Sequence, residues 1–142
     1  TGIEPDWRHF GRSLLPVISG ETEEHRDAAF AEGGMLPGDV LVDQFHVDKY
    51  GDESPYWPAQ SIFVENHPSA HKAAMCRTRE YKYVHRLSEP DELYDLVNDP
   101  MELTNQINDP DLAEVVETMK DRLMRWYLET NDVLPMDLDR RR

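Results

Sequence analysis

The sequence predicts an α+β fold in which a small antiparallel sheet of about four strands is covered on one face by one long C-terminal helix. Two observations predict this fold. Short apolar and aromatic runs separated by turn residues occupy the region before residue 96, and a helical apolar period follows from residue 110 to 129. A helix with a single apolar stripe needs a surface to cover, and the preceding strands supply it.

The strands are predicted from runs that end at turn signals. The first lies within residues 25–32 and ends at the Gly33-Gly34 pair. Residues 73–78 and 81–86 form two strands joined by a tight connection, and residues 92–96 form a third strand before the turn at Asp99-Pro100. Together they make residues 73–96 the strand region of the sheet.

The helix is predicted over residues 110–129. Asp109 is in the N-cap position, and Pro110 occupies the first helical position, where its missing N–H costs nothing. The predicted core stripe is Leu112, Val116, Met119, Leu123 and Trp126, with Val115 and Tyr127 beside it. Asn131 and Pro135 end the helix.

Residues 34–72 show no clear period and are predicted to be irregular. Glycines and prolines interrupt this segment, aromatic residues are scattered through it, and residues 61–65 are its one candidate strand. Long irregular segments in a folded domain are often functional.

The charge balance excludes several partners. The chain has 15 basic and 29 acidic residues, which give a net charge of −14, so nucleic acid and anionic membranes are disfavoured as partners. No apolar run reaches the roughly 18 residues that span a bilayer. The single cysteine, Cys76, cannot form an internal disulfide and favours a reducing compartment such as the cytoplasm.

Two blocks of sequence resemble the C-terminal subdomain of the sulfatase family. Residues 75–84 match a strand pair carrying Arg-Thr and Tyr-Lys, and residues 91–102, with Asn105, match Glu-Leu-Tyr-Asp-Leu, an Asp-Pro turn, Glu and Asn. Upstream, residues 1–5 and 11–16 are similar to the exit from the family's large catalytic domain. The resemblance therefore implies a remnant of that domain over residues 1–24 and a C-terminal subdomain over residues 25–142.

The resemblance also implies where the chemistry lies. Sulfatases hydrolyse sulfate esters with a formylglycine, made from the Cys of a Cys-x-Pro-x-Arg motif, and a divalent cation, calcium or magnesium, in the N-terminal domain. Cys76 is followed by Arg77-Thr78-Arg79-Glu80, which does not fit that motif. We therefore expect no catalytic residue, no cofactor and no metal ligand in this segment, and a missing N-terminal catalytic domain as its partner, with homo-oligomer contacts possible.

Three residues of the irregular segment are candidates for substrate binding. His67, His71 and Lys72 could attract an anionic sulfate ester without taking part in bond cleavage. Pro68 between the two histidines argues against a helix that would make them a metal pair. The alternative explanation is that all three are solvated surface residues.

The parent would be a sulfuric ester hydrolase, although phosphonate and phosphate monoester hydrolases share its scaffold. In that case we expect an exposed apolar patch where the missing domain docks, made of Trp7, Leu14, Leu15, Val17 and Ile18. The alternative is a stand-alone acidic interaction domain that binds a protein through an exposed strand edge or its basic strand pair.

Overall fold

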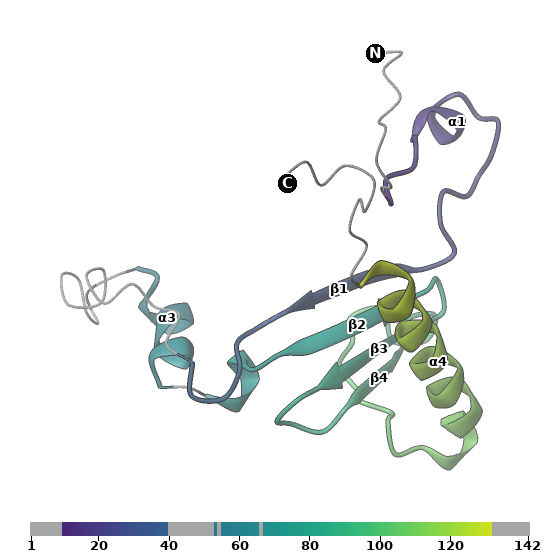
Figure 1. The fold of residues 1–142 in the computed structure, drawn as a ribbon. Coiled ribbons are helices and arrows are strands. Elements are labelled where there is room, and N and C mark those ends of the chain that lie inside the picture. The colour runs from purple at the N-terminus through teal and green to yellow at the C-terminus, as the bar shows by residue number, and fades with distance from the viewer. Residues whose placement is uncertain (1–9, 40–52, 54, 66, 132–142) are drawn as a thin grey trace, which may run out of the picture.

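The sheet is a four-stranded antiparallel meander in the order β1-β2-β3-β4 (Figure 1). The computed structural model describes residues 10–39, 53, 55–65 and 67–131. Its strands are β1 (Ala29–Gly33), β2 (Ala73–Arg77), β3 (Tyr81–Arg86) and β4 (Glu92–Asp95). The long helix α4 (Ala113–Thr130) covers one face of the sheet, which confirms the predicted α+β fold.

The core lies between α4 and the strands. The register places Phe30, Cys76, Tyr83 and Leu93 in one row across the four strands, so their side chains share the face toward the helix. Cys76 and Leu93 are fully buried. From the helix, Val116, Met119 and Leu123 close the core, and Leu112, Val115, Trp126 and Tyr127 pack around it, as the sequence predicted.

The helix begins with one turn of 3-10 geometry. This turn, η3 (Pro110–Leu112), is capped by Asp109, whose carboxylate accepts from the Asp111 amide at 2.9 Å. Asn131 leaves the helical conformation at the other end. No helix within the described residues combines the length and the apolar character needed to cross a membrane.

Asn105 closes the outer edge of β4. Its side-chain oxygen accepts from the Leu93 amide at 3.0 Å, and the next amide, that of Gln106, donates to the Leu93 carbonyl at 2.8 Å. An edge strand otherwise presents unpaired backbone groups to other chains. The role of Asn105 in the resemblance is therefore architectural.

The predicted strand over residues 61–65 is wrong, because these residues belong to α3 (Trp57–Val64) and the turn after it. Pro58 suits the first turn of a helix, where its missing N–H has no partner to lose. The Glu65 amide donates to the Ser61 carbonyl at 2.8 Å, which continues the helical bonding. A second short helix, η2 (Pro68–Ala70), follows, so the segment is less irregular than predicted; residues 40–52 lie outside the described range.

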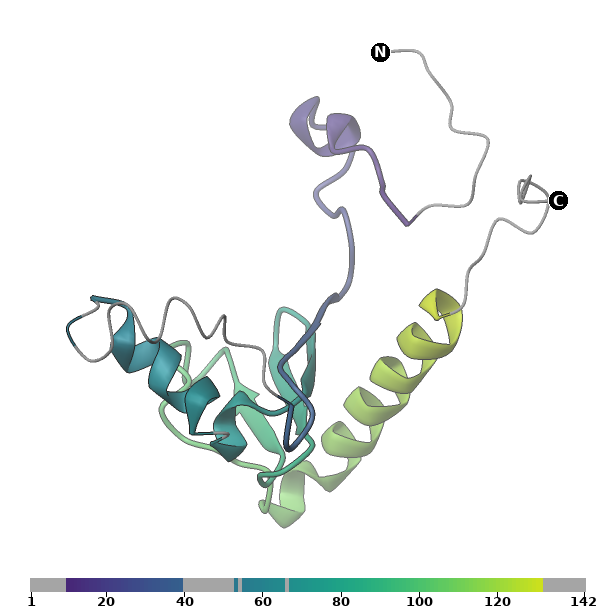
Figure 2. The same cartoon turned by 60° about the vertical axis from the view of Figure 1, so that its left-hand side comes forward.

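An arm formed by residues 10–26 extends away from the sheet and carries the short helix α1 (Leu15–Ile18) (Figures 1 and 2). Its two ends are joined where the Arg26 guanidinium donates to the Phe10 carbonyl and His25 contacts the Arg12 carbonyl at 3.2 Å. Leu14, Leu15 and Ile18 are 57%, 70% and 76% exposed. This part of the predicted apolar patch is exposed as expected, while Trp7 lies outside the described residues.

Candidate functional site

The two ends of the segment between β1 and β2 are joined by a backbone clasp, formed by residues 34–35 and 70–72. The Met35 amide donates to the Ala70 carbonyl at 3.0 Å, and the Lys72 amide donates to the Met35 carbonyl at 2.9 Å. Gly34 has φ +93, and a Cβ there would lie 2.5 Å from the His71 carbonyl oxygen. Only glycine fits this approach. The clasp thereby fixes the positions of His71 and Lys72.

The three predicted substrate residues lie in different surroundings. His67 is exposed and caps η2, accepting from the Ser69 amide at 3.2 Å. His71 is only 8% exposed, and its Nδ1 lies 2.6 Å from the Ser88 hydroxyl. Lys72 is exposed at the mouth of a cleft. The structure thus places Lys72 at a cleft, gives His67 a bond within its own turn and gives His71 a bond to Ser88, 17 residues away. The explanation that all three are solvated surface residues is therefore wrong for His71.

This cleft, the Lys72 cleft, has a volume of about 630 Å³ and lies between the end of the sheet and the end of α4. It is lined by a cation, an imidazole, a carboxylate and a phenol, which are Lys72, His85, Glu32 and Tyr127. Sequence reasoning assigned only Lys72 to a site.

His85 is held in the cleft by a partly buried carboxylate, that of Asp91. Its Nδ1 lies 2.9 Å from Asp91 Oδ1, while the Tyr83 hydroxyl donates to Asp91 Oδ2 at 2.6 Å. Burial by itself would raise the pKa of Asp91, but the hydrogen bonds from Tyr83, the Arg86 amide and His85 outweigh it and lower that pKa. Because Nδ1 donates to a carboxylate, Nε2 is the ring nitrogen left for a ligand, on a side chain that is 62% exposed.

The cleft is also lined by a phenol-carboxylate pair, Tyr127 and Glu32. The Tyr127 hydroxyl donates to Glu32 Oε2 at 2.8 Å, and this bond joins α4 to β1. Burial and the Glu32 acceptor raise the pKa of Tyr127 to about 12, so the phenol remains protonated at neutral pH. The cleft can bind and orient a polar or anionic group, but it contains no activated nucleophile.

The catalytic groups of a sulfatase do not fit the described residues. Cys76 is fully buried in the core, and burial raises the pKa of its thiol, so no enzyme could reach it for conversion to a formylglycine in the folded chain. Within the described ranges no group of three or more His, Cys, Asp or Glu side chains is arranged to hold a metal ion.

The basic strand pair is neutralised by acidic neighbours. Arg77 and Lys82 both bond to Glu102, with the Arg77 contact at 3.0 Å. Arg86 contacts Glu92 at 2.5 Å, and Arg79 contacts Glu24 at 3.4 Å. These pairs weaken the alternative in which the basic strand pair recruits an acidic protein.

More than half of the sequence matches a known protein family. Residues 39–129 match the family described as N-sulphoglucosamine sulphohydrolase, C-terminal. The human N-sulphoglucosamine sulphohydrolase is 44% identical over 41 residues, which cover 29% of this chain and 8% of that protein.

Two solved structures show the same arrangement. The phosphonate monoester hydrolase of Agrobacterium radiobacter is 32% identical, with a TM-score of 0.55 over 84% of this chain and 20% of its own. A 2-O GAG sulfatase, BT1596, is 20% identical, with a TM-score of 0.61 over 92% of this chain and 22% of its own, and this likeness shows the fold alone. The chain therefore spans about a fifth of each of these structures.

Proposed function

Because the chain belongs to the N-sulphoglucosamine sulphohydrolase C-terminal family, we propose that it completes the fold of a larger enzyme that hydrolyses sulfuric esters. The observation that carries this proposal is the family match over residues 39–129, in a chain that covers only 8% of the human enzyme it resembles. The described α+β unit has one sheet layer packed against one helix layer, but its described residues hold neither the nucleophile nor the metal ligands that such hydrolysis needs.

We propose that the N-terminal catalytic domain of the parent supplies those groups. A formylglycine would provide the nucleophile there, and a calcium or magnesium ion would stabilise the developing negative charge. Cys76 has a structural role instead, since it lies in the row of core residues between Phe30 and Tyr83. This subdomain would therefore be inactive by itself.

The exposed arm supports a docking role for the N-terminal part. Leu14, Leu15 and Ile18 expose apolar side chains on a segment that leaves the body of the subdomain. Exposed apolar groups of this kind usually mark an interface. We propose that residues 1–24 lead from the catalytic domain and that these three side chains pack against it.

We also propose that the segment containing His67, His71 and Lys72 forms one wall of the substrate cleft. Lys72 has the strongest support, because it lines the Lys72 cleft beside His85. A cation there would favour a substrate that carries negative charge outside the scissile group. Its role would be in selectivity and not in bond cleavage.

The experiment is to assay the full-length parent with an aryl sulfate and an aryl phosphonate monoester. A higher kcat/KM for the sulfate is expected, and it should be abolished when the formylglycine precursor in the catalytic domain is replaced. Lys72→Ala should then change the ratio of kcat/KM between anionic and neutral sulfate esters. Lys120→Ala, which removes an exposed cation outside the Lys72 cleft, is the matched control and should leave that ratio unchanged. A parent without a catalytic domain, or inactive on both esters, would overturn the proposal.

The second candidate reaction is phosphonate monoester hydrolysis. It is favoured by the likeness to the Agrobacterium radiobacter phosphonate monoester hydrolase, which is 32% identical over 84% of this chain. The match to the human sulphohydrolase has a higher identity but covers only 29% of this chain. A higher kcat/KM for the phosphonate in the same assay would select this reaction.

A further inference from the structure

A second cleft, of about 570 Å³, lies where the base of the arm meets the start of β1 and the last turns of α4. We name it the arginine cleft, because Arg12, Arg26, Arg122 and Arg125 line it. Among the described residues that line it, two are carboxylates, Asp27 and Glu129, although the chain carries 29 acidic residues and a net charge of −14. The cleft is thus a local positive region in an acidic protein.

The arginines differ in how far their donors are already used. Arg122 is paired with Asp27, and Arg26 donates to the Phe10 carbonyl, so these two hold the cleft together. Within the described residues, Arg125 bonds through Nε, which donates to Asp121 at 2.6 Å. Across the described part of the chain, no side chain pairs with the guanidinium of Arg12. A guanidinium has five N–H donors, so Arg12 and Arg125 keep most of theirs for a ligand.

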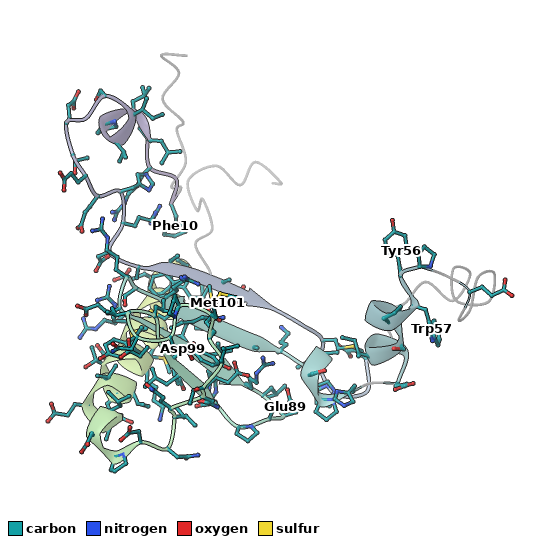
Figure 3. All side chains as sticks on the ribbon, turned by 180° about the vertical axis from the view of Figure 1, so that it is seen from behind. Phe10, Tyr56, Trp57, Glu89, Asp99 and Met101 are labelled. Carbon is teal, nitrogen blue, oxygen red and sulfur yellow. The ribbon has the colours of Figure 1, made fainter. Side chains whose placement is uncertain are left out.

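One wall of the arginine cleft is made of two stacked aromatic rings. Phe30 and Trp126 stack with ring centroids 5.1 Å apart and planes inclined by 2°, and both pack against the core. Figure 3 shows Phe10 at the base of the arm, beside the start of β1. The bonds of His25 to the Arg12 carbonyl and of Arg26 to the Phe10 carbonyl join the two ends of the arm, and so hold the backbone of Arg12 close to the residues that lead into β1.

We infer that the arginine cleft binds the oxyanion of a sulfate or phosphate ester through Arg12 and Arg125. Planar guanidinium forks match the oxygens of such tetrahedral anions, and each charge-assisted pair is about twice as strong as a neutral hydrogen bond. The negative net charge opposes anion binding over most of the surface, so the tightest binding of a small anion should be in the arginine cleft, ahead of the Lys72 cleft with its one lysine. This site lies apart from Lys72 and does not depend on the parent's reaction.

The test is a titration of the full chain with inorganic sulfate and, separately, inorganic phosphate, followed by amide NMR shifts at constant ionic strength. Saturable shifts are expected at the backbone around Arg12 and Arg125 with either anion. Arg12→Gln and Arg125→Gln should each weaken binding about ten-fold, the size expected when a charged hydrogen bond is lost. Both residues are exposed, so the variants should fold, and unchanged unfolding midpoints would verify this.

The matched control is Arg79→Gln, which removes the same charge from a side chain that is 74% exposed and outside the arginine cleft. Arg79→Gln should weaken anion binding by less than about two-fold, because at this distance salt screens most of the attraction between the arginine charge and the anion. An equal loss in the control, or no saturable binding of either anion, would overturn the inference. Binding of an acidic peptide in the absence of anion binding would overturn it in favour of a protein partner.

Discussion

The sheet and helix of residues 73–130 and the arm of residues 10–26 use similar apolar side chains with opposite results. In the first region Val116, Met119 and Leu123 are buried against the strands, whereas in the arm Leu15 and Ile18 remain exposed. The apolar pattern shows that a surface needs a cover, but it does not say which part of a protein provides the cover. For the helix the cover lies in this chain; for the arm we place it in the parent enzyme.

The sheet and helix also differ from the arm in their hydrogen bonds. The turns of the sheet are closed by side chains such as Asp95, which accepts from the Val97 and Asn98 amides at 2.9 and 3.0 Å. In the arm, the bonds of His25 and Arg26 join its two ends to each other, and the exposed Arg79–Glu24 pair at 3.4 Å is its contact with the turn between β2 and β3. The sheet and helix should therefore unfold as one cooperative unit, while the arm contributes little to the stability of this chain.

The sharpest test of the comparison is Leu123→Ala in the helix. This substitution leaves a cavity in the core, so the free energy of unfolding should fall by about 2–5 kcal/mol. Urea unfolding followed by circular dichroism measures the change. A loss of only a few tenths of a kcal/mol would mean that the helix does not cover the sheet as described.

Asp91→Asn should cost less, about 1–3 kcal/mol at neutral pH, because the bonds from Tyr83 and the Arg86 amide lose a charged acceptor. The folded pKa of Asp91 is lowered, so its contribution is present above the unfolded pKa of about 3.9 and is lost as the pH falls through the folded value. Unfolding at pH 7, 4 and 3 should therefore show the wild type and the variant converging on the acid side. Parallel pH profiles would contradict this assignment.

Glu102→Gln tests the outer face of the sheet, where one carboxylate serves both Arg77 and Lys82. The expected loss is about 0.2–1 kcal/mol, since partly exposed ion pairs contribute little. Glu102 also has a positive φ of 57. Glu102→Gly removes the same two ion pairs but also relieves the strained backbone, because glycine tolerates a positive φ. The free energy of unfolding should therefore fall less for Glu102→Gly than for Glu102→Gln. A larger loss for Gly than for Gln would indicate that the backbone there is unstrained.

The smallest effect is expected in the arm. Replacing Leu14, Leu15 and Ile18 by Ser should each change the unfolding free energy of this chain by less than about 0.5 kcal/mol. The same substitutions in the full-length parent should lower its stability measurably, because there the side chains would be covered. An unchanged parent would break the comparison, since the arm would then have no partner.

The regular elements could be predicted because each has a local signal. Strand alternation identified β2 and β3, and the cap at Asp109 with the stripe from Leu112 to Trp126 identified the helix. The helix α3 was missed because WPAQSIFV is apolar on nearly every side, and such a short run has no period that separates a helix from a strand.

The candidate site was predictable only in part. Lys72 was identified from its charge and its place before the strand region. Its neighbours in the cleft include the Tyr127–Glu32 pair, whose members lie 95 residues apart in the sequence. A contact of that range depends on how the helix crosses the sheet, and no local pattern encodes it. The Asp91–His85 bond spans only six residues, so it could have been proposed from the turn between β3 and β4.

The clasp at Met35 and His71 has a consequence for the evolution of this subdomain. Because the segment leaves and rejoins the sheet at one point, its length can change without altering the register of β1 against β2. In a flexible connection, each doubling of length adds only about 0.6 kcal/mol of closure entropy. Insertions and deletions should therefore accumulate between residues 36 and 70 among relatives, while Gly34 and the strands on either side stay constant.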